Sequence, residues 1–281
     1  MEVNAYIVVT SVLAIILLIL CIYIISIIVY PKKPIEYLKK TLDLNPNSEY
    51  IYDDCTSYET FESPNTHMKH KIFYLEKDNT TGIIIIDLPG GAFLSSSNTL
   101  VPYKYINQPH TVVSLEYPVL PQGRMTTALN YLYDAITYVL DKFSNPKIIM
   151  SAASAGVFYA TKIINSEKFT DSIIKFISTS GYFGYKTLEN IATIITDKIY
   201  LRKLSKSTLN DCVPILPHIS TLFVIGELDA MKSSTIEFLK QSGAENEAIE
   251  YPNADHCFYL RYNNEITKGY YADVGNFIVM T

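Results

Sequence analysis

The sequence predicts an α/β fold, in which a mainly parallel β-sheet carries helices on both faces. Three observations support this prediction. Runs of β-branched residues alternate with helical patterns from Thr81 onward, one of these helices has a well-defined apolar stripe, and 48% of the 281 residues are apolar. Alternating strands and helices favour parallel strands joined by crossover helices. A chain of this length can also bury one large core.

The expected strands are short segments rich in isoleucine, valine and other apolar residues. They occupy residues 82–88, 110–117, 147–151, 173–180, 221–229 and 248–252. Helical patterns follow the second, third and fifth of these segments, and another ends the chain. In sheets of this kind, ligands bind at the carboxyl ends of the strands. Those ends are therefore where functional residues are expected.

The helix after the second strand is clearly defined. Its apolar residues recur at steps of three and four, which places them on one face of a helix. They are Met125, Ala128, Leu129, Leu132, Ile136, Val139 and Leu140. This stripe predicts a helix that packs on the sheet.

The composition argues against several classes of protein. A net charge of −5 and the lack of a basic cluster in the sequence argue against a nucleic-acid partner. Cys21, Cys55, Cys212 and Cys257 form no C-x-x-C pair and lack the spacing typical of metal ligands. We therefore expect neither a disulfide framework nor a structural metal site.

The N-terminal segment predicts a membrane anchor. Ala5 to Tyr30 are 26 residues without a charge, dominated by isoleucine, leucine, valine and alanine. As a helix they would extend about 39 Å, enough to cross a hydrocarbon core of about 30 Å with some tilt. Glu2 is the only charge before this segment, whereas a cleaved signal peptide has a basic start and a shorter apolar core. We therefore expect one retained transmembrane helix that binds the chain to a lipid bilayer.

Basic residues after the anchor predict its orientation. Lys32, Lys33, Lys39 and Lys40 follow it, and the positive-inside rule places such residues in the cytosol together with the domain that they precede. A lumenal domain is the alternative, and in that orientation the glycosylation sequon at Asn79 would be usable. The endoplasmic reticulum is one candidate membrane. The sequence does not determine the oligomeric state.

A serine in a turn of small residues is the first candidate for a functional site. Ser154 follows an apolar strand and precedes a helical pattern, with Ala152, Ala155 and Gly156 around it. A serine on such a turn is exposed with a strained backbone, and the amides that follow it can bind a developing oxyanion. By itself, the pattern is also that of an ordinary helix start.

Two adjacent glycines follow the first expected strand. The strand is followed directly by Pro89, Gly90 and Gly91. Adjacent glycines let backbone amides approach a ligand closely, as an oxyanion hole requires. An ordinary Pro-Gly turn is the alternative interpretation of these residues.

An aspartate and a histidine follow the last two expected strands. Asp229 comes at the end of the fifth strand, where it can orient an imidazole, although a turn or helix-capping role is the alternative. His256 follows the sixth strand. The chain order Ser154, Asp229, His256 is that of α/β-hydrolase triads, and each of the three residues comes just after an expected strand.

These segments together resemble the hormone-sensitive-lipase-like esterases, which include the arylacetamide deacetylases. The resemblance covers the chain from about Thr81 to Phe258. PGGAF resembles the oxyanion loop H-G-G-G-[FW], SLEYPVLPQGRM resembles the D-Y-R-L-A-P-E block, and KIIMSAASAG resembles the strand and turn that carry G-D-S-A-G. Further along, LFVIGELDAM and YPNADHCF resemble the stretches that carry the acid and the histidine. The resemblance implies an α/β-hydrolase fold.

The resemblance also implies a role for each candidate residue. His256 would take the proton of Ser154 as this serine attacks an ester carbonyl, and Asp229 would hold the imidazole in the required tautomer. The implied activity is hydrolysis of carboxylic esters of lipids, sterols or other small hydrophobic acyl compounds. An acyltransferase, thioesterase or amidase would use the same three side chains.

The remaining parts of the implied site are a set of amides and a cap. The amides of Gly90, Gly91 and Ala155 would bind the oxyanion, and no metal or organic cofactor would be needed. In the implied organisation, residues 31–80 are a linker that contributes to the cap, and residues 81–281 are the hydrolase domain. Within that domain, the variable stretch 182–210 would form a small cap over the acyl pocket, although plain helical packing explains its composition equally well.

The chain departs from the family pattern at several positions. Pro89 replaces the family's histidine, Ala92 a glycine of the loop, and Ala152 the first glycine of the serine turn. These changes favour an alternative in which a catalytically impaired domain serves as a membrane-tethered binding module, whereas the complete triad order favours an enzyme. Cys257 follows the histidine in place of a glycine. Because Ser154 occupies the turn, we expect Cys257 to be a packed thiol rather than a nucleophile.

Overall fold

The computed structural model describes residues 13, 16–21, 55–77, 81–97, 100–183, 219–242, 247–260 and 264–280. The chain divides into two compact units, Met1–Asp43 and Leu44–Thr281. In the first unit, Leu13 and residues 16–21 are helical. No helix within the described ranges is both long and apolar enough to cross a membrane. The rest of the predicted anchor from Ala5 to Tyr30 lies outside these ranges.

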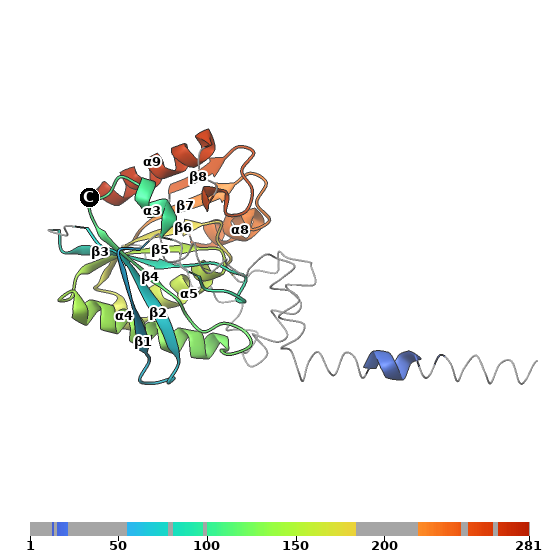
Figure 1. Cartoon of the computed structure of the whole chain (residues 1–281). Coiled ribbons are helices and arrows are strands. Elements are labelled where there is room, and N and C mark those ends of the chain that lie inside the picture. Colours follow the sequence, from blue (N-terminus) through green and yellow to red (C-terminus); the bar gives the residue numbers. More distant parts are fainter. Residues whose placement is uncertain are drawn as a thin grey trace, which may run out of the picture. The chain divides into compact units, whose positions relative to one another are not determined.

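An eight-stranded sheet forms the centre of the second unit as far as it is described, in the order β1-β2-β4-β3-β5-β6-β7-β8 (Figure 1). Its strands are β1 (Ser57–Glu62), β2 (Lys69–Leu75), β3 (Ile83–Leu88), β4 (Thr111–Leu115), β5 (Lys147–Ala153), β6 (Ile173–Thr179), β7 (Ser220–Gly226) and β8 (Glu247–Tyr251). The first two neighbour pairs, β1 with β2 and β2 with β4, are antiparallel. All the other pairs are parallel. The carboxyl ends of β3, β5, β7 and β8 therefore meet at one edge of the sheet.

Helices cover both faces of this sheet. They are α3 (Val101–Tyr105), α4 (Met125–Lys142), α5 (Ala155–Ile164), α8 (Lys232–Ser242) and α9 (Glu265–Val279), with short 3-10 helices η1 (Glu167–Phe169) and η3 (Phe258–Leu260). Figure 1 shows α3 and α9 on one side of the strands and α4 and α5 on the other. Ile84, Ile85 and Ile86 are fully buried in β3, as expected for a parallel strand covered on both faces.

The structure confirms the mainly parallel sheet and its six predicted strands. It adds β1 and β2, which lie within the 31–80 segment that was expected to be a linker, and it adds α3. β1 has the sequence SYETFE and forms the edge of the sheet, with none of its residues fully buried. An edge strand needs few apolar residues, so the sequence gives little sign of it.

A buried aspartate attaches the β1–β2 turn to α4. The carboxylate of Asp134 accepts hydrogen bonds from Ser63 Oγ (2.6 Å), from the backbone amide of Asn65 (3.2 Å) and from Asn65 Nδ2 (2.6 Å). Ser63 is fully buried and Asp134 is 8% exposed. Because the buried hydroxyl of Ser63 cannot turn to water instead, the carboxylate helps to fix the turn between the two edge strands to the helix.

We expect Asp134→Ala to lower the free energy of unfolding by about 1–3 kcal/mol, because it removes the acceptor of the buried Ser63 hydroxyl. Urea denaturation followed by circular dichroism measures this change. The control is Asp141→Ala on the exposed end of the same helix, which should change the free energy by no more than about 0.5 kcal/mol. Equal effects of the two substitutions would contradict the assigned role of Asp134.

Candidate active site

Ser154 occupies a strained position between β5 and α5. Its backbone has φ 48° and ψ −120°, and its side chain does not cap the helix that follows. The backbone is held on both sides: the amide of Ser154 donates to the carbonyl of Thr179 (3.1 Å), and its own carbonyl accepts from the amide of Tyr182 (3.1 Å). A left-handed backbone costs a non-glycine residue about 1–3 kcal/mol and persists only where its surroundings enforce it. This turn presents the serine at the carboxyl edge of the sheet.

Close backbone contacts explain the small residues around the serine. A Cβ on Gly156 would lie 2.2 Å from the carbonyl oxygen of Leu88, and a Cβ on Gly90 would lie 2.9 Å from Ser154 Cβ. Glycine is therefore required where α5 meets the end of β3. Ala152, which stands where the sequence pattern of the resembling esterases has a glycine, is buried in β5, beside Leu88 of β3.

The structure brings the three predicted side chains together. His256 Nε2 lies 3.0 Å from Ser154 Oγ, and His256 Nδ1 lies 2.8 Å from Asp229 Oδ1. Asp229 follows β7 and His256 follows β8, so each residue is located just after a strand, as predicted. The resulting series of hydrogen bonds connects a buried carboxylate, an imidazole and a hydroxyl.

Asp229 is suited to hold a negative charge next to the imidazole. Its side chain is only 1% exposed, and Oδ1 also accepts a hydrogen bond from the amide of Met231 (2.7 Å). Burial raises the pKa of Asp229, but the hydrogen bonds with His256, Ser180 and the Met231 amide lower it by more. The pKa therefore lies below its ordinary value. Asp229 is therefore a carboxylate at neutral pH.

The opposite shift applies to His256. Burial lowers the pKa of this imidazole, but the hydrogen bond and charge of Asp229, together with the neighbouring Cys257, outweigh burial and raise the pKa above its ordinary value. The imidazole is thus a stronger base than a free histidine. In its neutral form, which prevails above that pKa, the imidazole that contacts the Ser154 hydroxyl can accept its proton during nucleophilic attack.

The glycine loop after β3 presents free amides near the serine. Gly91 has φ 126°, and its carbonyl accepts hydrogen bonds from the amides of Leu94 (2.8 Å) and Ser95 (3.0 Å), which closes the loop on itself. Within the described part of the chain, no acceptor takes the amide protons of Gly90, Gly91 or Ala155. Since Ala155 is also the first residue of α5, its amide lies at the positive end of the helix dipole. An oxyanion could bind there.

Sequence reasoning missed Ser180, which joins the loops that carry the acid and the histidine. Ser180 follows β6, is 2% exposed and has φ 51°. Its hydroxyl accepts a hydrogen bond from the amide of Cys257 (3.2 Å) and lowers the pKa of Asp229. The left-handed backbone of Ser180 sets it apart in the structure. In the sequence it is only a serine after a strand, which gives no sign of this conformation.

Two predictions near the site are covered only in part. Of the expected cap at 182–210, the structure describes Tyr182 and Phe183, and the ring of Tyr182 packs against Phe93 at 5.7 Å. The other cap residues and Cys212 lie outside the described ranges. Cys257 is a free, partly buried cysteine, and the imidazole nitrogen that would activate a nucleophile contacts Ser154.

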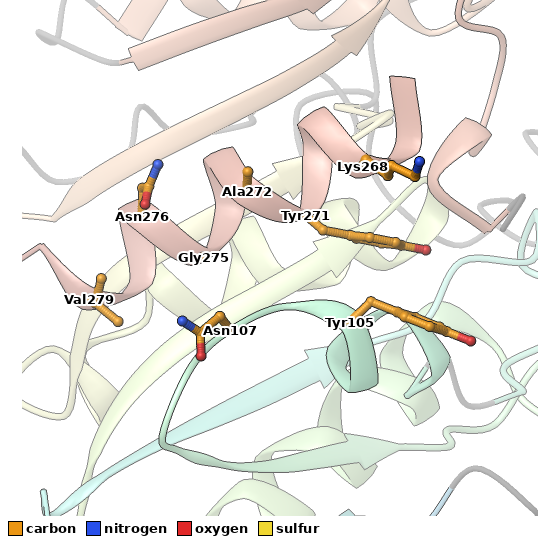
Figure 2. Close-up of a pocket in the computed structure, with 8 residues that line it drawn as sticks. All are labelled: Tyr105, Asn107, Lys268, Tyr271, Ala272, Gly275, Asn276 and Val279. Carbon is orange, nitrogen blue, oxygen red and sulfur yellow. The ribbon is translucent and has the colours of Figure 1, made fainter. Parts of the chain in front are cut away.

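A separate cavity lies between α3 and α9. Its volume is about 540 Å³. Figure 2 shows that the rings of Tyr105 and Tyr271 face each other along one wall, and their centroids are 5.5 Å apart with an interplanar angle of 13°. Ser154, Asp229 and His256 do not line this cavity, so it is distinct from the candidate active site.

Comparison with known proteins identifies the fold. No family model and no curated protein match the chain. Solved structures do match. They include esterase LipW from Mycobacterium marinum (TM-score 0.70, 14% identity, 88% of this chain and 89% of that one). Another is a hyperthermophilic esterase from the archaeon Pyrobaculum calidifontis (TM-score 0.66, 13% identity, 87% of this chain and 92% of that one). A third is a bacterial heroin esterase (TM-score 0.65, 17% identity, 79% of this chain and 82% of that one). These likenesses confirm the predicted α/β-hydrolase fold.

We expect His256 to titrate above the ordinary histidine pKa of about 6.5, because the carboxylate of Asp229 stabilises the imidazolium. Asp229→Asn removes that charge and should bring the pKa of His256 down. NMR of isotope-labelled histidine measures both values, with His256→Gln identifying the resonance. An identical titration in the native protein and in Asp229→Asn would contradict the assigned coupling.

Proposed function

We propose that this chain is a serine esterase similar to the hormone-sensitive-lipase-like group, which hydrolyses carboxylic esters through Ser154, His256 and Asp229. The observation that most supports this proposal is the series of hydrogen bonds from Ser154 Oγ to His256 Nε2 (3.0 Å) and from His256 Nδ1 to Asp229 Oδ1 (2.8 Å). The similarity of the fold to many esterases supports the same reaction class.

The first half of the proposed reaction forms an acyl-enzyme. Ser154 Oγ attacks the carbonyl carbon of the ester while His256 Nε2 takes the hydroxyl proton. The carbonyl oxygen becomes an oxyanion, and the tetrahedral intermediate collapses when His256 returns the proton to the oxygen of the leaving alcohol. In the second half, a water molecule takes the place of Ser154 as the nucleophile, and the acid is released with the hydroxyl of Ser154 restored.

Asp229 and the glycine loop would lower the barrier in different ways. Asp229 holds the proton on His256 Nδ1, so that Nε2 is the basic nitrogen, and it stabilises the imidazolium formed during attack. The amides of Gly90, Gly91 and Ala155 would stabilise the oxyanion, and one such donor typically contributes about 3–4 kcal/mol. The strongest electrostatic effects therefore act only after the attack has begun, as transition-state stabilisation requires.

Apolar surroundings favour a hydrophobic substrate. The rings of Phe93, Phe158 and Tyr182 form a buried apolar cluster beside the glycine loop, at centroid distances of 5.7–6.0 Å, so the exposed apolar surface near the site comes from two leucines. Leu228, directly before Asp229, is 65% exposed, and Leu260, near His256, is 36% exposed. We therefore propose esters of lipids, sterols or other small hydrophobic acyl compounds as the substrate class.

A membrane anchor at Ala5 to Tyr30 is part of the proposal. It rests on the absence of charge in that segment, and it would hold the domain near a bilayer in which hydrophobic esters are concentrated. The four lysines that follow it favour a cytosolic domain. A retained anchor and this orientation can be tested together.

We expect an epitope placed after Thr281 to be reached by antibody when only the plasma membrane is permeabilised, because the positive-inside rule places the domain in the cytosol. We also expect the protein to stay in the membrane fraction after alkaline extraction. A lumenal marker of the same membrane, which should stay inaccessible, is the control. Protection of the epitope would reverse the proposed orientation, and release of the protein by alkaline extraction would contradict a retained anchor.

A catalytically impaired binding module is the second candidate function. Pro89 and Ala92 in the glycine loop favour it, because they replace residues that the resemblance associates with the oxyanion loop. Both candidates place a small ligand at the same site. They differ in whether Ser154 reacts.

We expect a fluorophosphonate probe to label the membrane-reconstituted protein at Ser154, because His256 makes its hydroxyl nucleophilic. Ser154→Ala should abolish both labelling and hydrolysis of short-chain esters. The matched control is Ser178→Ala: Ser178 is a buried serine on the neighbouring strand whose hydroxyl has no hydrogen-bond partner among the described residues. A folded native protein that shows no labelling dependent on Ser154 would rule out the esterase and leave the binding module.

A further inference from the structure

The glycine loop is fixed by a tyrosine that is not part of the proposed triad. We propose that Tyr117 is a positioning residue for ester hydrolysis: its phenol hydroxyl sets the orientation of the peptide between Pro89 and Gly90, and thereby aims the Gly90 amide. This inference rests on the proposed function, because the amide matters only if an oxyanion forms near Ser154.

The contact itself is short and fully enclosed. The hydroxyl of Tyr117 donates a hydrogen bond to the carbonyl oxygen of Pro89 over 2.5 Å. Tyr117 is 0% exposed, so water cannot replace either partner. A buried hydrogen bond of this kind is costly to break, because the carbonyl and the hydroxyl would both lose their partner.

The planarity of the peptide bond converts this contact into control of an amide. In a trans peptide the carbonyl and the following N–H point in opposite directions. Fixing the Pro89 carbonyl toward Tyr117 therefore directs the Gly90 N–H away from Tyr117. Gly90 lies against the nucleophile, since a Cβ placed on it would be 2.9 Å from Ser154 Cβ.

The residues on either side of this peptide provide little orientation of their own. Pro89 has no amide hydrogen, so it cannot anchor the loop by donating. Gly90 has no side chain and can adopt either sign of φ. The same carbonyl oxygen also approaches Gly156, where an added Cβ would lie 2.8 Å from it. The hydroxyl of Tyr117 is thus the directional contact at this point of the loop.

Tyr117 is itself held in place by the loop that it fixes. Ser96 Oγ donates to the carbonyl of Tyr117 (2.7 Å) and accepts from its amide (3.1 Å). The ring packs against Tyr159 of α5 at a centroid distance of 4.9 Å. Further on, the amide of Leu120 donates to the carbonyl of Phe93 (3.1 Å). Residues 117–120 therefore hold the loop at its beginning, its middle and its end.

Tyr117→Phe tests this role because it removes only the hydroxyl and keeps the ring. We expect kcat for a short-chain ester to fall by about 10- to 100-fold, less than the full loss of one oxyanion donor, while KM changes by less than about twofold. The loss should be larger for an oxygen ester than for its thiono analogue, because sulfur accepts hydrogen bonds more weakly. A general weakening of the fold would slow both substrates equally.

Tyr131→Phe is the matched control. Tyr131 is also a fully buried tyrosine, but it lies on α4, where its ring packs against Phe61 and His70 and not against the glycine loop. We expect this variant to keep the native kcat. If Tyr117→Phe keeps it as well, or loses activity equally on the oxygen and thiono esters, the inference is overturned.

Hydrogen exchange gives a second measurement that needs no substrate. Peptides that cover Pro89 to Ser96 should exchange faster in Tyr117→Phe than in the native protein or in Tyr131→Phe, while peptides of β3, β5 and α5 keep their protection and show that the fold is intact. Unchanged exchange in the loop would overturn the inference. A native protein without Ser154-dependent activity would refute the proposed function alone, since loop exchange would still show whether Tyr117 orients these residues.

Discussion

The arrangement of the candidate site depends on the close approach of the first turn of α5 to the end of β3. Gly156 permits this approach, because a Cβ there would lie 2.2 Å from the carbonyl oxygen of Leu88. The approach places the glycine loop beside Ser154 and the amide of Ala155 at the same point. Asp229 and His256 then need only be carried to this edge by β7 and β8, which the parallel sheet does.

The sequence predicts the parts of the molecule whose signals are local. The central strands are visible as apolar runs, since parallel strands are buried on both faces, and Ile84 to Ile86 is the clearest example. Ser154, Asp229 and His256 could be predicted because each follows a strand and their chain order is that of a known constellation. Their distances from one another could not be read from the sequence, because they depend on strand order and register.

What the sequence did not reveal depends on contacts between distant segments. β1 is mostly polar and joins the sheet through hydrogen bonds with β2, so its apolar content gives no sign of it. Ser180 is an ordinary residue in the sequence, and Tyr117 is visible there only as part of the segment that resembles the D-Y-R-L-A-P-E block. Only the fold places Ser180 against Cys257 and Tyr117 against Pro89. Pro89 stands where the esterases that the chain resembles have a histidine, a change that favours the binding module. In the structure, the neighbouring segment supplies contacts that order the glycine loop.

The left-handed backbone of Ser154 (φ 48°) sets stability and chemistry against each other at a single residue. Glycine alone would relieve the strain there, and it would remove the hydroxyl in the same step. Retention of a serine at this position therefore lowers the stability of the fold, and selection for stability alone would favour its loss. In the proposed esterase, this strain would be the cost of holding a reactive hydroxyl against the imidazole of His256.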